Sequence, residues 1–106
     1  AQTGRIKLPK HFELQSAYPN PFNPATTVRF AVPANGTSAA SDISLAIYDI
    51  LGRKVKTLIN GITEPGYYDV VWDGSDESGS KVASGIYFII YRNPAGLIPQ
   101  KVILME

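Results

Sequence analysis

Hydrophobic and polar residues alternate with period two over several short stretches of this chain, the pattern of a half-buried β-strand. Residues 26–32 show it most clearly, and residues 43–47 and 68–72 repeat it. The rows of side chains predicted to face a core are Val28, Phe30 and Val32; Ile43, Leu45 and Ile47; and Tyr68, Val70 and Trp72. Their neighbours Thr27, Arg29 and Ala31 are predicted to face outwards. No stretch has the capped 3.6-residue period of a helix, so the pattern predicts an all-β fold.

The other apolar stretches depart from plain alternation. Residues 12–17 are short enough for an edge strand only. In residues 54–60, Val55 and Leu58 are three positions apart, which predicts either a β-bulge or partial cover on both faces. Residues 85–91 are apolar on both faces and are therefore expected in a central or covered strand. Residues 97–105 form the last strand, with Val102 and Leu104 on one face and Ile103 and Met105 on the other.

Turn signals separate these stretches. Small and polar residues predict loops over residues 34–41, 61–66 and 73–79, and Asn-Pro-Ala-Gly at residues 93–96 predicts a hairpin turn. Gly52 offers a positive φ to the turn after the third predicted strand. About seven short strands separated by turns every 8–12 residues or so are typical of an antiparallel, immunoglobulin-like β-sandwich.

Residues 18–24 (Tyr-Pro-Asn-Pro-Phe-Asn-Pro) are the most constrained part of the chain. Three prolines remove backbone donors and fix φ, so this segment is excluded from a helix interior or an inner strand. Each residue before a proline is driven towards extended conformations. We therefore expect a rigid crossover, with Tyr18 and Phe22 projecting from it, that delivers the chain to the first inner strand at Thr26.

Composition narrows the class of protein further. The chain has 106 residues, enough for one domain, and a net charge of +1 from 10 basic and 9 acidic residues. This near-neutral charge predicts no strongly positive surface that would bind nucleic acid or anionic lipid. It has no cysteine, which excludes disulfides and thiolate metal sites. No apolar run is long enough to span a membrane as a helix. Residues 1–10 look like a polar linker remnant and residues 11–106 like the domain itself.

Few residues point to catalysis or metal binding. His11 is the single histidine, and it lies at the start of the first predicted strand, away from any predicted nucleophile. Asp73, Asp76 and Glu77 offer oxygen ligands for Ca²⁺, but they are few. Turn formation explains them better, because aspartate side chains accept hydrogen bonds from nearby backbone N–H groups. We expect no enzymatic activity, no cofactor and no metal site.

Two other kinds of site have candidate residues in the sequence. Trp72, Tyr67, Tyr68 and Tyr48 are candidates for a sugar-stacking platform, but alternation places Trp72 and Tyr68 in the core. A Lys–Asn cross-link catalysed by an acid, drawn from Lys54, Asn60 and Asp69, is a weak candidate, because most such residues are simply solvated.

Four motifs occur in a specific order: residues 18–24, the Ile-Tyr-Asp-Ile-Leu-Gly-Arg-Lys-Val run at 47–55, the Trp-Asp-Gly loop at 72–79, and Val-Ala-Ser-Gly-Ile-Tyr at 82–87. Gln-Lys-Val-Ile-Leu at residues 100–104 closes the chain. Together they resemble the C-terminal sorting domain of the type IX (Por) secretion system, which is similar to the immunoglobulin-like domain of the flagellar hook-capping protein. The resemblance covers residues 12–106. Pro99 and a shorter polar and lysine run before Lys101 depart from the family pattern.

The resemblance implies a role in protein traffic. Such a domain directs a larger upstream passenger through the periplasm and across the outer membrane by a dedicated translocon. A surface sortase-like peptidase then commonly removes the domain and attaches the passenger at the cell surface. The alternatives are an accessory carbohydrate- or partner-binding module, or a structural spacer of an extracellular enzyme or flagellar assembly.

The expected contact surface combines the turn after the third strand, the start of the sixth strand and the end of the last. Its residues are Gly52, Val55, Gly85, Tyr87, Lys101, Val102, Ile103 and Leu104. If the last strand is a sheet edge, its backbone is available for pairing with a partner or with a second copy of the chain. Ile103 is expected on its outward face beside Phe88 and Ile90, so self-association through this strand is a further expectation.

Overall fold

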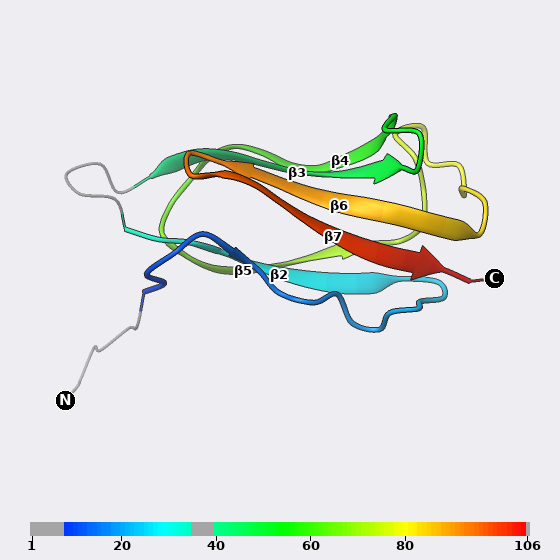
Figure 1. Cartoon of the computed structure of the whole chain (residues 1–106), viewed down its shortest axis with the longest axis horizontal. Helices are drawn as coiled ribbons and strands as arrows, with labels where there is room; N and C mark the ends of the chain where they lie inside the picture. Colours follow the sequence, from blue (N-terminus) through cyan, green and yellow to red (C-terminus); the bar gives the residue numbers. More distant parts are fainter. Residues whose placement is uncertain (1–7, 35–39, 106) are drawn as a thin grey trace.

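Two antiparallel β-sheets pack face to face in the computed structural model, which describes residues 8–34 and 40–105 (Figure 1). One sheet has three strands in the order β1-β2-β5 and the other has four in the order β4-β3-β6-β7. The strands are β1 (Glu13–Leu14), β2 (Thr26–Val32), β3 (Ser41–Asp49), β4 (Lys54–Thr63), β5 (Gly66–Trp72), β6 (Gly85–Asn93) and β7 (Gly96–Leu104). The all-β, immunoglobulin-like sandwich predicted from the sequence is confirmed.

The core lies between the sheets and consists of the predicted inward rows. Val28, Phe30, Val32, Ile43, Leu45, Ile47 and Trp72 are all buried, together with Ile89, Tyr91 and Val102 from the last hairpin. Phe30 stacks on Tyr68 and meets Tyr91 edge-on, each at 5.3 Å between ring centroids. The Tyr91 hydroxyl donates a 2.7 Å hydrogen bond to the Ala31 carbonyl. Its apolar surroundings raise the pKa of Tyr91, so the phenol stays a donor.

The irregular pattern in β4 has a structural cause that the sequence predicted. Cα pairing with β3 skips one residue at Leu58 and one at Val55, the two residues that broke the period of two. Each skip is a β-bulge, which lets consecutive side chains of β4 change faces. Val55, Leu58 and Ile59 consequently all pack partly against the core.

Three local expectations were wrong. Residues 61–66 are mostly strand rather than loop, because β4 continues to Thr63 and β5 begins at Gly66. The first strand is reduced to Glu13–Leu14. Ala31 is buried although it is on the outward side of β2, since its small side chain lies between the larger cross-strand neighbours Glu13 and Tyr67.

The last hairpin follows the sequence prediction closely. β6 is an inner strand between β3 and β7, as its apolar residues on both faces indicated. Asn93 and Gly96 pair across a turn in which the Asn93 side chain accepts a hydrogen bond from the Ala95 N–H. β7 is an edge strand. Within residues 8–34 and 40–105 there is no helix that could cross a membrane.

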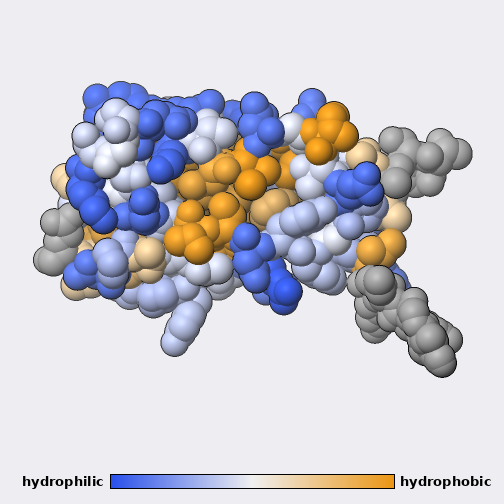
Figure 2. Space-filling model, turned by 180° about the vertical axis from the view of Figure 1, so that it is seen from behind, coloured by the Kyte–Doolittle hydropathy of each residue, from blue (hydrophilic) through white to orange (hydrophobic). Residues whose placement is uncertain are grey.

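The two sides of the sandwich are closed differently. β1 and β7 lie together on one side, and β4 and β5 on the other. Figure 2 views the molecule from behind, where β4 and β5 lie, and shows hydrophobic side chains gathered in the middle of that face. Leu58, Ile59 and Val70 are half-buried residues of these two strands.

The expected loop at 34–41 and linker at 1–10 fall largely outside the described residues.

Candidate binding surface at one end of the sandwich

An aromatic cluster brings three of the sequence motifs together at one end of the molecule. Phe22 of the proline segment (residues 18–24) packs on Trp72 at 5.3 Å between ring centroids. Trp72 meets Tyr87 edge-on at 5.2 Å. All three side chains are buried, and the Tyr87 hydroxyl donates to the Ala83 carbonyl at 2.6 Å. The motifs therefore form one structural unit although they are far apart in the sequence.

The proline segment covers the edge of β7. The Phe22 N–H donates to the Ile103 carbonyl, and the Met105 N–H donates to the Phe22 carbonyl, both at 2.9 Å, which is a parallel pairing. The Asn20 side-chain amide adds two hydrogen bonds: it accepts from the Ile103 N–H at 3.0 Å and donates to the Lys101 carbonyl at 3.1 Å. The three X–Pro peptide bonds in this segment are cis.

Gln100 continues this cover towards β1. Its side-chain oxygen accepts from the Ala17 N–H at 2.5 Å, and its side-chain nitrogen donates to the Gln15 carbonyl at 2.8 Å. One amide group thus links β7 to the backbone of the segment that follows β1. Residues 15–22 and 100–105 are therefore joined along their length.

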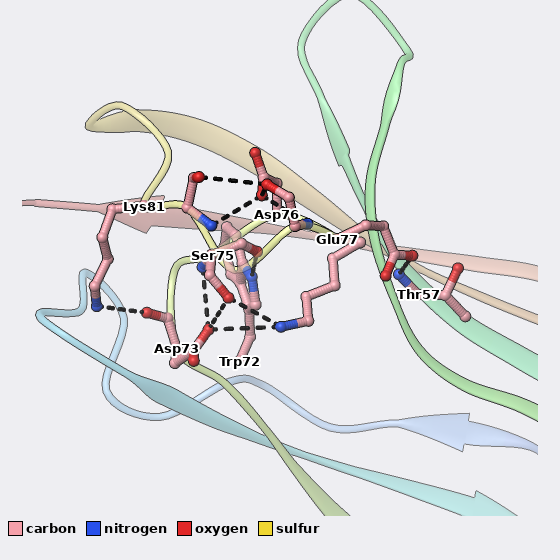
Figure 3. A network of polar contacts seen from close by, with 10 residues as sticks. Thr57, Trp72, Asp73, Ser75, Asp76, Glu77 and Lys81 are labelled. Carbon is pink, nitrogen blue, oxygen red and sulfur yellow. Dashed lines mark hydrogen bonds and ion pairs between the residues drawn. The ribbon is translucent and has the colours of Figure 1, made fainter.

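The polar loop after β5 is ordered by its aspartates (Figure 3). Asp73 Oδ1 accepts from the Ser75 N–H and hydroxyl, and Asp76 Oδ1 accepts from Ser78 and from the Ser80 N–H. These hydrogen bonds favour the ionised carboxylates: the Ser75 hydroxyl lowers the pKa of Asp73, and the Ser78 hydroxyl lowers the pKa of Asp76. The Trp72 indole N–H donates to the Ser75 carbonyl at 2.9 Å, which fixes the loop to the core. The prediction that these aspartates form turns is confirmed.

The same loop covers part of the edge of β4. The Glu77 N–H donates to the Val55 carbonyl at 3.2 Å, and the Glu77 carboxylate accepts from the Thr57 N–H at 2.7 Å. Lys56 Nζ donates to the Ser75 hydroxyl at 2.9 Å. A side-chain carboxylate and a loop backbone thus take the place of a neighbouring strand beside the bulged part of β4.

The turn between β3 and β4 is ordered by Asp49 and carries an apolar tip. Asp49 Oδ1 accepts from the Leu51 and Arg53 N–H groups, while Oδ2 pairs with the Arg53 guanidinium at 2.9 Å. The Arg53 N–H is the main reason that the pKa of Asp49 is lowered. Gly52 has φ 81°, the left-handed conformation expected of it. Ile50 and Leu51 are left 68% and 72% exposed.

The eight residues of the expected contact surface fall into two groups. Tyr87, Val102 and Leu104 are buried, and Val55 packs partly against the core, so these four side chains support the surface from inside. Gly52 and Lys101 are exposed, whereas Gly85 and Ile103 are half-buried. Whether a partner contacts these residues stays a prediction.

The expectation of a freely available last strand needs correction. β7 is an edge strand as supposed, but the backbone groups of Lys101, Ile103 and Met105 already bond to Asn20 and Phe22. An incoming strand would have to displace them. The outward face of β7 is unaffected, and Ile103 lies on it beside Ile86 of β6.

Other candidate residues are not assembled into sites. His11 is exposed near the start of the described chain. Tyr48 and Tyr67 lie on the outer faces of opposite sheets, so they share no sugar-stacking platform. Asp69 pairs with Arg29 in the three-stranded sheet, whereas Lys54 and Asn60 are in β4. No cluster of three metal-ligating side chains occurs within the described parts of the chain.

Asn20, Gln100 and Glu77 contribute most to closing the edges, and sequence reasoning missed all three. Asn20 precedes a proline, and the sequence predicts for it only an extended conformation. Their hydrogen bonds join residues 20 to 85 positions apart, and no local pattern marks such bonds. The exposed hairpin tip could have been found from the sequence, because Ile50 and Leu51 are adjacent apolar residues in a predicted turn.

The fold and this end of the molecule define an immunoglobulin-like β-sandwich domain whose strand edges are partly covered by its own loops. The chain belongs to the FlgD Ig-like domain family, whose model matches residues 22–90. The relationship to the flagellar hook-capping domain inferred from the motifs is thereby confirmed.

Two solved structures from Porphyromonas gingivalis share the fold. The first is dimeric latent PorU, with 24% sequence identity, a TM-score of 0.60, and 85% of this chain covered. The second is PorZ, described as an essential bacterial surface component of the type-IX secretion system, with 22% identity, a TM-score of 0.56 and 90% covered. This chain spans only 9% of the PorU chain and 11% of the PorZ chain. No curated protein sequence matches it.

Proposed function

We propose that this domain is a non-enzymatic C-terminal sorting domain of the type IX secretion system. In this role it is recognised as a folded unit by an outer-membrane translocon, and it directs a larger upstream passenger to the cell surface. A surface sortase-like peptidase then acts at the junction between passenger and domain.

The observation that carries this proposal is the convergence of the family-like motifs at one end of the sandwich. Phe22, Trp72 and Tyr87 come from three motifs and pack on one another, and residues 20 and 22 bond to the 100–104 motif. A spacer needs only a stable core. Here Tyr87 of this cluster pairs across the strands with Asp49, whose hydrogen bonds order the turn that carries the exposed Ile50 and Leu51. The likeness in fold to a domain of PorZ, a type-IX secretion component, supports the same proposal.

The test is export of a reporter. Residues 11–106 are fused behind a signal peptide and a folded reporter enzyme, in a bacterium that has the type IX pathway. We expect the reporter at the cell surface, detected by protease accessibility on intact cells. Where the peptidase removes the domain, the molecular mass of the surface reporter is lower than that of the fusion by the mass of the domain.

Two controls make the result specific. The reporter alone, and the reporter fused to an unrelated immunoglobulin-like sandwich, should stay in the periplasm. A host that lacks the translocon should retain every fusion. Periplasmic retention of the wild-type fusion beside an exported positive control would reject sorting in favour of a binding or spacer role.

A further inference from the structure

The outer face of the four-stranded sheet carries an ordered arrangement of aromatic and basic residues. The strand registers place Lys54, Tyr48, Phe88 and Lys101 in one row across β4, β3, β6 and β7. Both rings are half-buried, and both lysines are exposed. The two aromatic residues thus occupy the middle of the sheet, with a cation at each end of the row.

Apolar residues extend this row in both directions. On one side Ala46, Ile90 and Pro99 are cross-strand neighbours, and on the other Ile86 pairs with Ile103. A cleft of about 400 Å³ lies on this face, lined by residues that include Tyr48, Ile50, Phe88, Ile90 and Leu97. The exposed hairpin tip at Ile50 forms one wall of this cleft, so the face is hollowed as well as apolar.

Charge on this face is strongly one-sided. Lys54, Lys101 and Arg92 lie on it. Its acids are Asp42, which pairs with Ile62 at the far corner, and Asp49, which lines the cleft and forms an ion pair with Arg53. Because Asp49 and Arg53 neutralise each other, the other three cations less Asp42 leave +2 on this face, while the whole chain has a net charge of +1. The basic character of the chain is therefore concentrated around the apolar centre.

From this arrangement we infer that the outer face of the four-stranded sheet docks another protein, through a surface with an apolar centre and an acidic rim. A second copy of the chain fits poorly, because face-to-face docking opposes like charges. Sugar stacking needs exposed coplanar rings, whereas Ile50, Ile86, Ile90 and Ile103 offer branched aliphatic groups. Three cations are too few for nucleic acid. The inference rests on the proposed function and names the chemistry of the partner.

The contact is tested by photo-crosslinking in the exporting host. A photoreactive phenylalanine analogue replaces Tyr48 in the reporter fusion, and in a matched fusion it replaces Val71, an exposed apolar residue on the outer face of the other sheet. We expect an adduct with one protein from position 48 and none from position 71. Mass spectrometry identifies that protein, which is then purified for binding measurements.

Charge complementarity is tested by reversal with the purified protein. Lys101→Glu should weaken binding on the order of five- to tenfold at low salt, with a smaller effect at high salt. Lys101→Arg keeps the charge, and Lys10→Glu makes the same reversal outside this face; both should stay within about twofold. Melting curves verify that each variant is folded.

Several outcomes would overturn the inference. These are adducts from position 71 alone, adducts only with other copies of the chain or with lipid or polysaccharide, no adduct from position 48, or an affinity that Lys101→Glu leaves unchanged. Failure of the proposed function is separate: a fusion that is not exported, but still gives a charge-dependent adduct from position 48, rejects sorting and keeps the docking face.

Discussion

Single carboxylates order the two polar turns of this domain, and they do so in their ionised form. Asp76 accepts hydrogen bonds from Ser78 and Ser80, and Asp49 accepts from Leu51 and Arg53. Each pKa is lowered by these donors. Because the folded state binds the proton more weakly than the unfolded chain does, ionisation contributes stability above the ordinary aspartate pKa of about 3.9.

This contribution should be lost as the pH falls through the lowered pKa of the folded state. We expect Asp76→Asn to reduce the loss of unfolding free energy between about pH 5 and pH 2.5, because asparagine keeps an acceptor but cannot be protonated in this range. Urea unfolding of both proteins across this range measures the effect. Equal pH dependence in the two proteins would show that Asp76 is not held ionised.

The two aromatic residues of the proline segment offer a matched comparison. Phe22 is 2% exposed and packs on Trp72, whereas Tyr18 is 81% exposed. Phe22→Ala should therefore cost about 3–5 kcal/mol of unfolding free energy through lost burial and a cavity. Tyr18→Ala should change it by about 0.5 kcal/mol or less. Similar losses in urea unfolding would mean that Phe22 is not an anchor of the core.

At the scale of elements, the main unusual feature is that residues 15–22, which form no regular strand beyond isolated bridges, cover the edge of β7. Asn20→Ala removes two hydrogen bonds and leaves the Ile103 N–H and the Lys101 carbonyl without this partner. We expect a loss of about 1–3 kcal/mol in unfolding free energy. We also expect more self-association than in the wild type, because an uncovered strand edge pairs readily.

Denaturant unfolding and sedimentation velocity measure these two effects. Asn23→Ala is the control, since it changes an exposed asparagine that also precedes a proline in the same segment. If both variants sediment like the wild type at high concentration, the cover over β7 is not what limits edge pairing.

Sequence pattern predicted the strands well because most of them are amphipathic or wholly apolar. The spacing of Val55 and Leu58 predicted either a bulge or partial cover on both faces of β4, and the structure shows register shifts at these two residues. It did not predict how the edges are closed. Glu77 and Gln100 are polar residues in unremarkable positions, and their partners are identified only by the fold. The covered edge of β7 was missed for the same reason: proline indicates that a segment is no inner strand, but not which edge it lies against.

At the scale of the whole molecule, edge protection is uneven. The bulged half of β4 is covered by Glu77, and β7 carries Pro99 ahead of the part covered by Asn20 and Phe22. Proline on an edge removes a donor that an incoming strand needs. The departure from the family pattern at Pro99 thus fits the role of this strand as a sheet edge.

The parallel pairing of residues 15–22 with β7 also determines how the domain bears mechanical load. The described chain enters at one end of the sandwich and leaves at the other, so a pull between its two ends runs along these neighbouring segments (Figure 1). The hydrogen bonds of Asn20, Phe22 and Gln100 lie across that direction and are stretched together in shear rather than opened one after another. We therefore expect the resistance of the domain to a pulling force to be determined by the contact between the segment that follows β1 and the last strand.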